Sequence, residues 1–401
     1  MSDLAGRRLF HVTTADISLA LLLGPQLEAF AAAGMEVIGV SAPGPYVEQL
    51  RDRGIPHIPL RNATRSVSIG HDVLALIELE RLFRRLRPDI VHTHNPKPGV
   101  YGRLAARAAG VPGIVNTVHG LYAAPEDPLT RKTVVYILER LASACSQVEL
   151  FQNPEDLEVM RRLGVPSGRL ELLGNGVDLQ RFQPHRSVSD VARARSALGI
   201  DPSALVIGMV GRLVWEKGLR ELFDAARRMR DIRPEVVFVI VGPLDDAKGD
   251  SLKPDDIAAA EAIGNIVFTG RRDDVEHLFG GFDLYVLPSY REGFPRSAME
   301  AAASGLPIVT TDVRGCREVV DHGVTGLLVP LHDVDALTQA LAELAGDPSR
   351  RGTMGVRARI KAEAEFDDRS VITKTLAAYR RLPEPPPSWG AERPPVTLSE
   401  P

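Results

Sequence analysis

The regular alternation of short apolar runs with longer amphipathic segments is the feature that most constrains how this chain of 401 residues folds. In the first series of this pattern, we expect strands at residues 9–13, 37–41, 55–60, 89–93, 113–118 and 147–152. Strands that alternate with helices of about ten or more residues form βαβ units and a mostly parallel sheet. The sequence therefore predicts an α/β fold.

A second series of the same kind begins after a pause between residues 172 and 190. Its strands are expected at residues 204–210, 236–241, 265–269, 283–287, 307–310 and 326–329. Two such series predict two doubly wound, Rossmann-like domains with a cleft between them, at residues 1–182 and 183–365. We expect a helix at 366–382 to pack back on the first domain, and the proline-rich segment 383–401 to be a disordered tail.

The overall composition excludes several classes of function. A net charge of −4 and an aromatic content of 5% argue against nucleic acid as a partner, because binding it needs basic surfaces and stacking rings. Cys145 and Cys316 fall in different predicted domains, which fits a reducing cytosol better than a disulfide framework. The apolar run at residues 17–23 is far shorter than the roughly 20 residues that span a bilayer. We therefore expect a cytoplasmic protein.

A cluster of four arginines in one predicted helix is open to two interpretations. Arg81, Arg84, Arg85 and Arg87 could face the inner surface of a membrane, or they could form a solvated helix face paired with glutamates one turn away. The sequence leaves peripheral membrane contact open, and it does not determine the oligomeric state.

Two glutamates, Glu292 and Glu300, lie eight positions apart directly after the predicted strand at 283–287. The first lies in a loop with Gly and Pro, and the second lies inside a helix expected to begin at about Pro295. Both should lie at the carboxyl end of a parallel strand, where open α/β sheets bind ligands. Carboxylates there can bind hydroxyl groups of a ligand or take part in proton transfer. A glutamate that only stabilises its own helix is the structural alternative.

Two cations, Arg212 and Lys217, follow the first strand of the second series and precede a predicted helix at 219–231. A cation near a helix N-terminus opposes the helix dipole, at a cost of roughly 0.3–1 kcal/mol. A bound anion would reverse this penalty, because backbone N–H groups and both cations would point at it. We therefore expect a diphosphate site, with two solvated surface side chains as the alternative. The segment matches neither a P-loop nor a dinucleotide-binding fingerprint.

Several histidines and acids are candidate ligands by residue type and position. His119 ends one predicted strand of the first domain, and we expect it to contact the ligand, although a lone histidine is more often structural. His92 and His94 end the strand before it, without a Cys or further acid at metal-ligand spacing. Asp333 and Asp335 form a D-x-D pattern, which we interpret as a helix cap. No metal site is therefore expected.

An ordered set of segments resembles the retaining glycosyltransferases of family 4, which have the GT-B fold. Glu292 and Glu300 look like the E-x7-E motif of that family, and residues 211–218 look like its G-R-L-x-x-x-K-G segment. Further matching segments are Val118-His119-Gly120 and residues 174–182, 315–320 and 326–330. The resemblance covers about residues 8–380. Each motif alone is modest, but the ordered set is specific.

The resemblance implies transfer of a sugar from a nucleotide diphosphate sugar, with retained anomeric configuration and no obligatory metal or cofactor. Arg212 and Lys217 would stabilise the charge that grows on the leaving diphosphate. Glu292 would bind hydroxyls of the donor sugar, and His119 would approach that sugar from the first domain. Glu300 would hold the ribose. The further donor-binding positions that the resemblance implies are Gly211, Arg271, Phe294, Pro295, Arg296 and Ser297.

The segment after the first strand departs from the family, many members of which carry a Gly-Gly loop there. This chain has Thr14, Asp16 and Ser18 in that place, and they become the candidates on the acceptor side. The sequence of residues 290–297 and 315–318 looks most like that of family members that build bacterial polysaccharides on a lipid diphosphate. We therefore expect a UDP-linked donor, such as a UDP-N-acetylhexosamine, and a lipid-linked saccharide acceptor. A UDP-sugar 2-epimerase and a non-catalytic nucleotide-sugar-binding protein are the alternatives.

Overall fold

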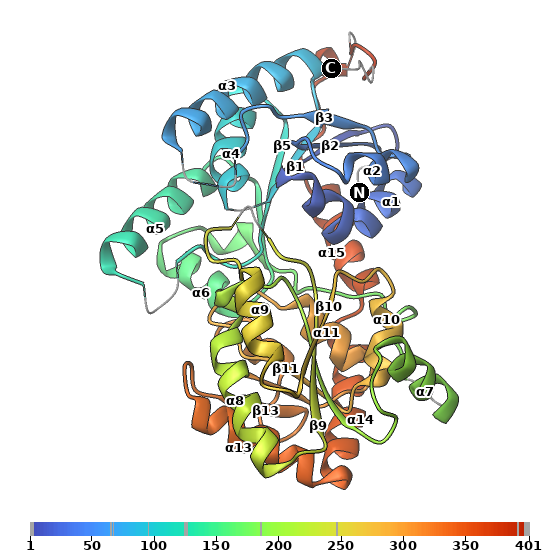
Figure 1. The fold of residues 1–401 in the computed structure, drawn as a ribbon. Helices are drawn as coiled ribbons and strands as arrows, with labels where there is room; N and C mark the ends of the chain where they lie inside the picture. The colour runs from blue at the N-terminus through green and yellow to red at the C-terminus, as the bar shows by residue number, and fades with distance from the viewer. Residues whose placement is uncertain are drawn as a thin grey trace. The chain divides into compact units, whose positions relative to one another are not determined.

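The computed structural model describes residues 4–64, 66, 68–94, 96–123, 127–184, 187–245, 248–390 and 393–396. The chain forms two compact units (Figure 1): unit 1 comprises Met1–Gly174 with Arg369–Pro401, and unit 2 comprises Asn175–Asp368. All paired strands in both sheets are parallel. The predicted α/β class with two Rossmann-like domains is therefore confirmed.

The unit boundaries differ from the predicted ones, which lay after residues 182 and 365. Residues 175–182 join unit 2, where Val177 and Asp367 form a short parallel bridge. The Val177 N–H donates to the Phe366 carbonyl at 2.9 Å, and Phe182 is buried in the unit 2 core. Backbone pairing between distant segments sets this boundary, and a local sequence pattern does not reveal it.

Unit 1 is built on a seven-stranded sheet with the order β3-β2-β1-β4-β5-β6-β7. The strands are β1 (Arg8–Ala15), β2 (Glu36–Ala42), β3 (His57–Pro59), β4 (Ile90–His94), β5 (Gly113–Val118), β6 (Val148–Phe151) and β7 (Leu170–Leu172). The chain first adds strands on one side of β1 and then continues from β4 on the other side. The pair β1/β4 is therefore the topological switch point, where such sheets bind ligands.

The helices of unit 1 cover both faces of its sheet. They are η1 (Ser18–Leu22), α1 (Gly24–Ala32), α2 (Val47–Asp52), α3 (Ile69–Leu86), α4 (Lys97–Ala109), α5 (Leu129–Ser143), α6 (Pro154–Arg162), η2 (Ser167–Arg169), α15 (Asp368–Arg380) and α16 (Pro387–Gly390). Side chains alternate between the faces with a period of two. Leu9 and Ile90 pack with Phe30 of α1 and Tyr379 of α15, whereas Phe10 packs with α3 on the other face.

The C-terminal segment differs from the predicted disordered tail where the structure describes it. Residues Pro387–Gly390 form α16, and Trp389 Nε1 donates to the Pro88 carbonyl at 3.0 Å. Arg393 forms an ion pair with the buried Asp89 of unit 1. One tryptophan and one arginine thus anchor a segment whose proline content alone suggested disorder. Residues 391–392 and 397–401 lie outside the described part of the chain.

Unit 2 is built on a six-stranded sheet with the order β10-β9-β8-β11-β12-β13, so its switch point is the pair β8/β11. The strands are β8 (Leu205–Val210), β9 (Val236–Val241), β10 (Ile266–Gly270), β11 (Leu284–Leu287), β12 (Ile308–Thr311) and β13 (Gly326–Val329). The helices are α7 (Val188–Ala197), η3 (Trp215–Lys217), α8 (Leu219–Ile232), α9 (Pro254–Glu261), α10 (Val275–Leu278), η4 (Phe279–Gly281), α11 (Arg296–Ala303), α12 (Cys316–Val319), α13 (Val334–Gly346) and α14 (Pro348–Glu365).

Candidate active site

The switch point of unit 2 brings together residues that the sequence placed in separate segments. The chain leaves β8 toward Arg212 and Lys217, and it leaves the neighbouring strand β11 toward Glu292. Lys217 Nζ lies 2.5 Å from Glu292 Oε1, and the two side chains are only 19% and 11% exposed. A cation and an acid from two predicted motifs therefore form one ion pair at the carboxyl edge of the sheet.

Two glycines allow the loops around this pair to approach closely. Gly218 has φ +73° and caps α8; a Cβ atom there would lie 1.9 Å from the Pro288 carbonyl oxygen. Gly315 has φ +81°, and a Cβ atom there would lie 2.8 Å from the carbonyl oxygen of Glu292. Only glycine fits both positions without a backbone shift. The loop with Lys217 and the loop with Glu292 are thus fixed against one another.

Arg212 has its own carboxylate partner. Its Nη1 lies 2.6 Å from Oδ2 of Asp245, a residue that follows β9, and the Arg212 side chain is 44% exposed. Gly211 lies directly before it and donates its N–H to the Val241 carbonyl at 2.9 Å. The sequence predicted that both cations would bind a diphosphate. In the structure each cation forms an ion pair with a carboxylate, so a diphosphate would have to replace Asp245 and Glu292 as the partners.

Glu300 lies on α11, which begins after Pro295 as predicted. Its Oε1 lies 3.2 Å from Arg296 Nε one turn earlier, and its side chain is 13% exposed. Burial raises the pKa of the Glu300 carboxyl, and Arg296 and then Arg181 oppose that rise. A largely buried carboxylate held by an arginine is suited to accept hydrogen bonds from a diol.

The remaining predicted donor-binding residues differ in the contacts that they make. Ser297 Oγ lies 2.7 Å from the hydroxyl of the buried Tyr285, which sequence reasoning did not single out. The ring of Phe294 packs edge-on against Phe366, with 5.7 Å between centroids, and this contact is a packing role. Arg271 follows β10, two strands away from β8, and pairs with Asp273 at 3.0 Å. Its role in donor binding stays a prediction.

His119 follows β5 in unit 1 and is partly exposed. Its Nε2 lies 2.9 Å from Nδ1 of His94. Burial lowers the pKa of the His119 imidazole to about 4, although a hydrogen bond with Gln152 opposes the shift. The ring is thus held neutral at the carboxyl edge of the unit 1 sheet.

The acceptor-side candidates lie at the end of β1, which includes Thr14, and directly after it. Asp16 is buried, and its two carboxylate oxygens accept hydrogen bonds from the backbone N–H groups of Ile17 (2.9 Å) and Tyr46 (2.7 Å). This carboxylate supports its own loop. Thr14 and Ser18 are partly exposed and remain better placed than Asp16 to meet a ligand.

The D-x-D pattern is a helix start. Asp333 is the N-cap of α13, and its Oδ1 accepts a hydrogen bond from the Ala336 N–H at 2.8 Å. Asp335 pairs instead with Arg228 of α8. The predicted capping role of this pattern is confirmed.

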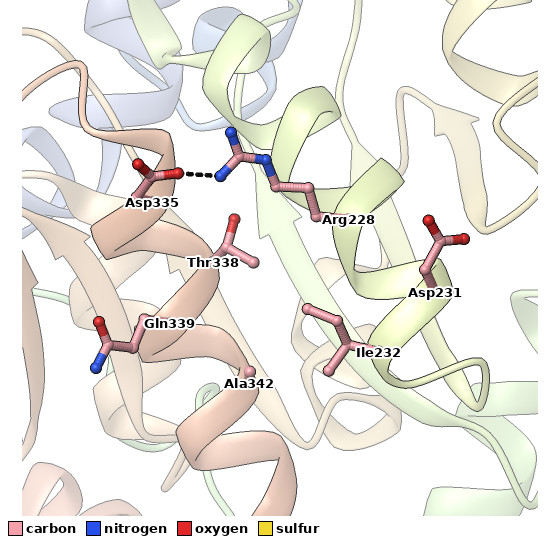
Figure 2. Close-up of a pocket in the computed structure, with 7 residues that line it drawn as sticks. All are labelled: Arg228, Asp231, Ile232, Asp335, Thr338, Gln339 and Ala342. Carbon is pink, nitrogen blue, oxygen red and sulfur yellow. Dashed lines mark hydrogen bonds and ion pairs between the residues drawn. The ribbon is translucent and has the colours of Figure 1, made fainter.

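A separate hollow lies between α8 and α13 of unit 2 (Figure 2). Its volume is about 450 Å³, and it is lined by Arg228, Asp231, Ile232, Asp335, Thr338, Gln339 and Ala342. The lining residues of α8 come from the end of that helix remote from Gly218. The hollow therefore lies away from the Lys217–Glu292 pair and has no candidate site residue in its wall.

Two families of known proteins match the chain. Residues 26–181 match the family described as Glycosyltransferase Family 4, and residues 190–361 match Glycosyl transferases group 1. A UDP-Gal:alpha-D-GlcNAc-diphosphoundecaprenol alpha-1,3-galactosyltransferase of Escherichia coli is 32% identical over 307 residues, which cover 76% of this chain and 78% of that protein. The capsular polysaccharide biosynthesis glycosyltransferase CapM of Staphylococcus aureus is 27% identical over 93% of this chain and 97% of its own.

Solved structures share the architecture of both units. HepE of Anabaena in complex with UDP and glucose matches with a TM-score of 0.79 at 20% identity, over 94% of this chain and all of that one. Sucrose-phosphate synthase of Thermosynechococcus elongatus matches with a TM-score of 0.78 at 21% identity, over 94% of this chain and 99% of that one. Together with the ordered motifs and the two parallel sheets, these matches identify the chain as a member of glycosyltransferase family 4 with the GT-B fold.

Proposed function

We propose that the protein transfers a sugar from a UDP-sugar to a hydroxyl group of a lipid-linked saccharide, with retention of the anomeric configuration and without a metal ion. The Lys217–Glu292 pair at the β8/β11 switch point is the observation that carries this proposal. It combines a cation for a diphosphate with an acid for sugar hydroxyls in one place. The E. coli relative is named for UDP-Gal as donor and a diphosphoundecaprenol-linked GlcNAc as acceptor, which supports the same classes of substrate here.

In this proposal the bond between the sugar C1 and the diphosphate oxygen breaks, and a bond between C1 and the acceptor oxygen forms on the same face. The acceptor proton passes to the departing diphosphate, so the charges balance without a metal ion. Arg212 and Lys217 stabilise the charge on the diphosphate. Glu300 holds the ribose and Glu292 the hydroxyls of the sugar. His119, directly after β5, is the unit 1 residue that we assign to contact with the sugar.

The two alternatives, an epimerase and a non-catalytic binding protein, differ in the support that the relatives give them. The named relatives are transferases, and none of them supports a UDP-sugar 2-epimerase. A nucleotide-sugar-binding protein without turnover would keep the same donor contacts. The distinction between a transferase and a binder therefore depends on turnover and not on affinity.

A donor panel tests the proposal. The full chain is incubated with UDP- and GDP-sugars and a diphosphoundecaprenol-linked saccharide, in buffer with and without EDTA, and nucleotide release is followed. We expect UDP release that depends on the acceptor and persists in EDTA, with a product whose anomeric proton shows the configuration of the donor. An inverted product or loss of activity in EDTA would contradict the mechanism, an isomerised sugar would indicate an epimerase, and binding without release would indicate a binder.

We further propose that unit 1 contacts the membrane that carries the acceptor, through α5. Val134, Ile137, Leu138 and Leu141 are exposed by 44% or more and recur at the spacing of one helix face. The basic side chains of α5 are Arg131, Lys132 and Arg140, and its one acidic residue, Glu139, is buried. Apolar side chains flanked by basic ones are typical of helices that lie on anionic bilayers.

In the part of the chain that the structure describes, none of the helices combines the length and the hydropathy of a membrane span.

Sedimentation with lipid vesicles tests the α5 contact. We expect binding to vesicles that contain phosphatidylglycerol and weaker binding to phosphatidylcholine alone. The double substitution Ile137→Ser with Leu141→Ser should reduce binding. The control is Val356→Ser with Ile360→Ser, which removes two exposed apolar side chains one turn apart on α14 of unit 2. Equal binding by both double variants would refute a role for α5.

A further inference from the structure

A line of hydrogen bonds crosses one buried face of the unit 1 sheet and ends at His119. It passes from Thr117 through His92, Tyr379, His11 and His94 to His119, and we call these six residues the histidine relay. The distances are 2.7 Å (Thr117 Oγ1–His92 Nε2), 2.6 Å (His92 Nδ1–Tyr379 Oη), 3.1 Å (Tyr379 Oη–His11 Nε2), 3.0 Å (His11 Nδ1–His94 Nε2) and 2.9 Å (His94 Nδ1–His119 Nε2). Gln152 hydrogen-bonds with His119 at the outer end.

The strand period explains why these side chains meet. His11 pairs in register with His92, and His94 pairs in register with Thr117, across three neighbouring parallel strands. Their side chains point to the same face, because successive residues of a strand alternate. Earlier on the same strands this face is apolar and packs under α1 and α15 (Figure 1), so each strand changes from apolar to polar toward its carboxyl end. Tyr379 reaches the row from α15.

A metal ion is the first alternative to consider, because nitrogen atoms of His11, His92 and His94 all lie within 4.8 Å of one another. The rings of His92 and His94 are stacked at 4.5 Å with only 19° between their planes, and those of His11 and His94 at 5.2 Å with 22°. Imidazole lone pairs lie in the ring plane, so stacked rings direct them side by side and not toward one ion about 2.0–2.1 Å away. Both nitrogens of His92 already face hydroxyl groups. The geometry is that of hydrogen bonds.

The relay has a direction because its imidazoles are neutral. Burial lowers the pKa of His11 to about 3, and it holds the pKa values of His92 and His94 well below their usual range. A neutral imidazole with both nitrogens bonded donates one hydrogen bond and accepts the other. The polarity of one link therefore sets the polarity of the next, and the whole line runs either toward His119 or away from it.

In one of these two arrangements the Thr117 hydroxyl donates to His92, and each member of the line donates to the next. His94 Nδ1 then donates to His119 Nε2, so the proton of His119 lies on Nδ1. Of the six relay residues, the four between the ends are at most 4% exposed, whereas His119 is partly exposed.

We propose that the histidine relay determines which ring nitrogen of His119 carries the proton, so that its other five members are positioning residues for His119. The consequence for catalysis rests on the proposed function, in which His119 meets the donor sugar. A histidine in the other tautomer offers an acceptor where a donor is required, and it loses its orienting contacts. Residues as distant in the sequence as His11 and Tyr379 would thus act on the reaction without touching the substrate.

Nitrogen NMR of the full chain with 15N-labelled histidine tests this proposal, because two-bond N–H correlations distinguish the two tautomers of each ring. We expect one tautomer for His119 in the wild type and both tautomers in Tyr379→Phe, which removes the hydroxyl in the middle of the relay. The matched control is Ser41→Ala, which removes a hydroxyl 2.9 Å from the buried His57 outside the relay. A single unchanged His119 tautomer in Tyr379→Phe, or mixed tautomers in the wild type, would overturn the proposal.

A second pair of variants keeps the test decisive if Tyr379→Phe does not fold. Thr117→Val should populate both tautomers of His119, and Thr117→Ser should restore one, because serine keeps the hydroxyl. In turnover assays Thr117→Val should lower kcat several-fold at unchanged donor KM, and serine should rescue it. If the wild type releases no UDP, the proposed function fails, whereas the NMR measurement still decides the relay.

Discussion

The order in which strands are added reverses at β1/β4 in unit 1 and at β8/β11 in unit 2, and these two switch points carry different kinds of side chains. The unit 1 switch point is lined by neutral imidazoles that are almost completely buried. The unit 2 switch point carries ion pairs, Lys217 with Glu292 and Arg212 with Asp245, whose side chains are 10% to 44% exposed. Neutral polar groups tolerate full burial when each is hydrogen-bonded, whereas charges need partners or water.

This difference suggests a division of tasks between the units. Ion pairs that retain some exposure can exchange one partner for a charged ligand, so unit 2 is suited to bind a diphosphate. A neutral, buried row of rings cannot take up a charge without the cost of desolvation. Unit 1 is therefore suited to present a ring of fixed orientation, and its role depends on the absence of protonation.

The largest expected effect that tests this comparison is a loss of unit 1 stability in mild acid. The pKa values of the four relay histidines and of His57 are all lowered by burial, to about 3 for His11 and about 4 for His57 and His119. Their contribution to stability is complete above pH 6.5 and is lost as the pH falls toward these values. For each imidazole, the free energy of unfolding falls by about 1.4 kcal/mol for every pH unit below 6.5 in that window. The effects of the five imidazoles add.

Unit 2 should behave differently in the same window. Burial raises the pKa of Glu300, and a carboxyl with a raised pKa favours the folded state as the pH falls. Hydrogen exchange measured by mass spectrometry at pH 7.5 and pH 5, corrected for the intrinsic rate, should show early loss of protection in β1, β4 and β5. If protection of β8 and β11 is lost first, the contrast between the units is wrong.

The next largest effect concerns a buried network of charged side chains in unit 1, which is an exception to the neutral character of the buried polar groups at its switch point. Arg103 of α4 bonds Glu149 at 2.6 Å and Glu139 at 2.5 Å, and all three side chains are at most 4% exposed. Arg103→Met leaves two buried carboxylates without their cation, which should destabilise the protein by about 3–5 kcal/mol. Chemical denaturation measures the loss, and Arg107→Met on the exposed side of the same helix is the control. Equal midpoints for both variants would show that this network is not stabilising.

A smaller but functionally sharper effect is expected at the unit 2 switch point. Lys217→Ala and Glu300→Ala should each lower donor turnover by about 100-fold or more, equivalent to about 2.7 kcal/mol, as for one preorganised transition-state contact. Lys361→Ala is the matched control. Lys361 lies on α14, and its Nζ forms an ion pair with Asp321 at 2.6 Å, so this variant also removes a lysine from an ion pair of unit 2. Near-normal turnover in both site variants would refute the assignment of the site to unit 2.

Local sequence patterns predicted most of the fold, because apolar runs and helix signals depend on neighbouring residues. The strand at β11, the start of α11 after Pro295 and the N-cap at Asp333 are of this kind. The pairing of Val177 with Asp367 and the anchoring of Trp389 on Pro88 depend on contacts between distant segments. Patterns read within one window cannot detect such contacts, and for this reason the unit boundaries and the described part of the C-terminal segment differ from what the sequence suggested.

The candidate site shows the same limit at the level of side chains. Residue type and position led to the prediction of three of its residues: Glu292 and His119 follow strands, and Lys217 lies near a helix N-terminus. Their partners were not predicted, because the course of two loops decides that Lys217 meets Glu292. The signal that could have revealed His11 is the alternation with Leu9, which places both on one face of β1. For Tyr379, no local signal distinguishes it from any other aromatic residue on a helix.

The smallest effect distinguishes a structural acid from a ligand in unit 2. Asp333 caps α13, so Asp333→Ala should lower the free energy of unfolding by about 1 kcal/mol. Asp335→Ala should cost less, because its side chain is 86% exposed and exposed ion pairs contribute little. Neither variant should change the dependence of turnover on divalent metal ions, since a cap binds backbone N–H groups. A metal requirement that disappears with Asp333 would contradict the capping role, and it would give unit 2 a second kind of charged site beside its ion pairs.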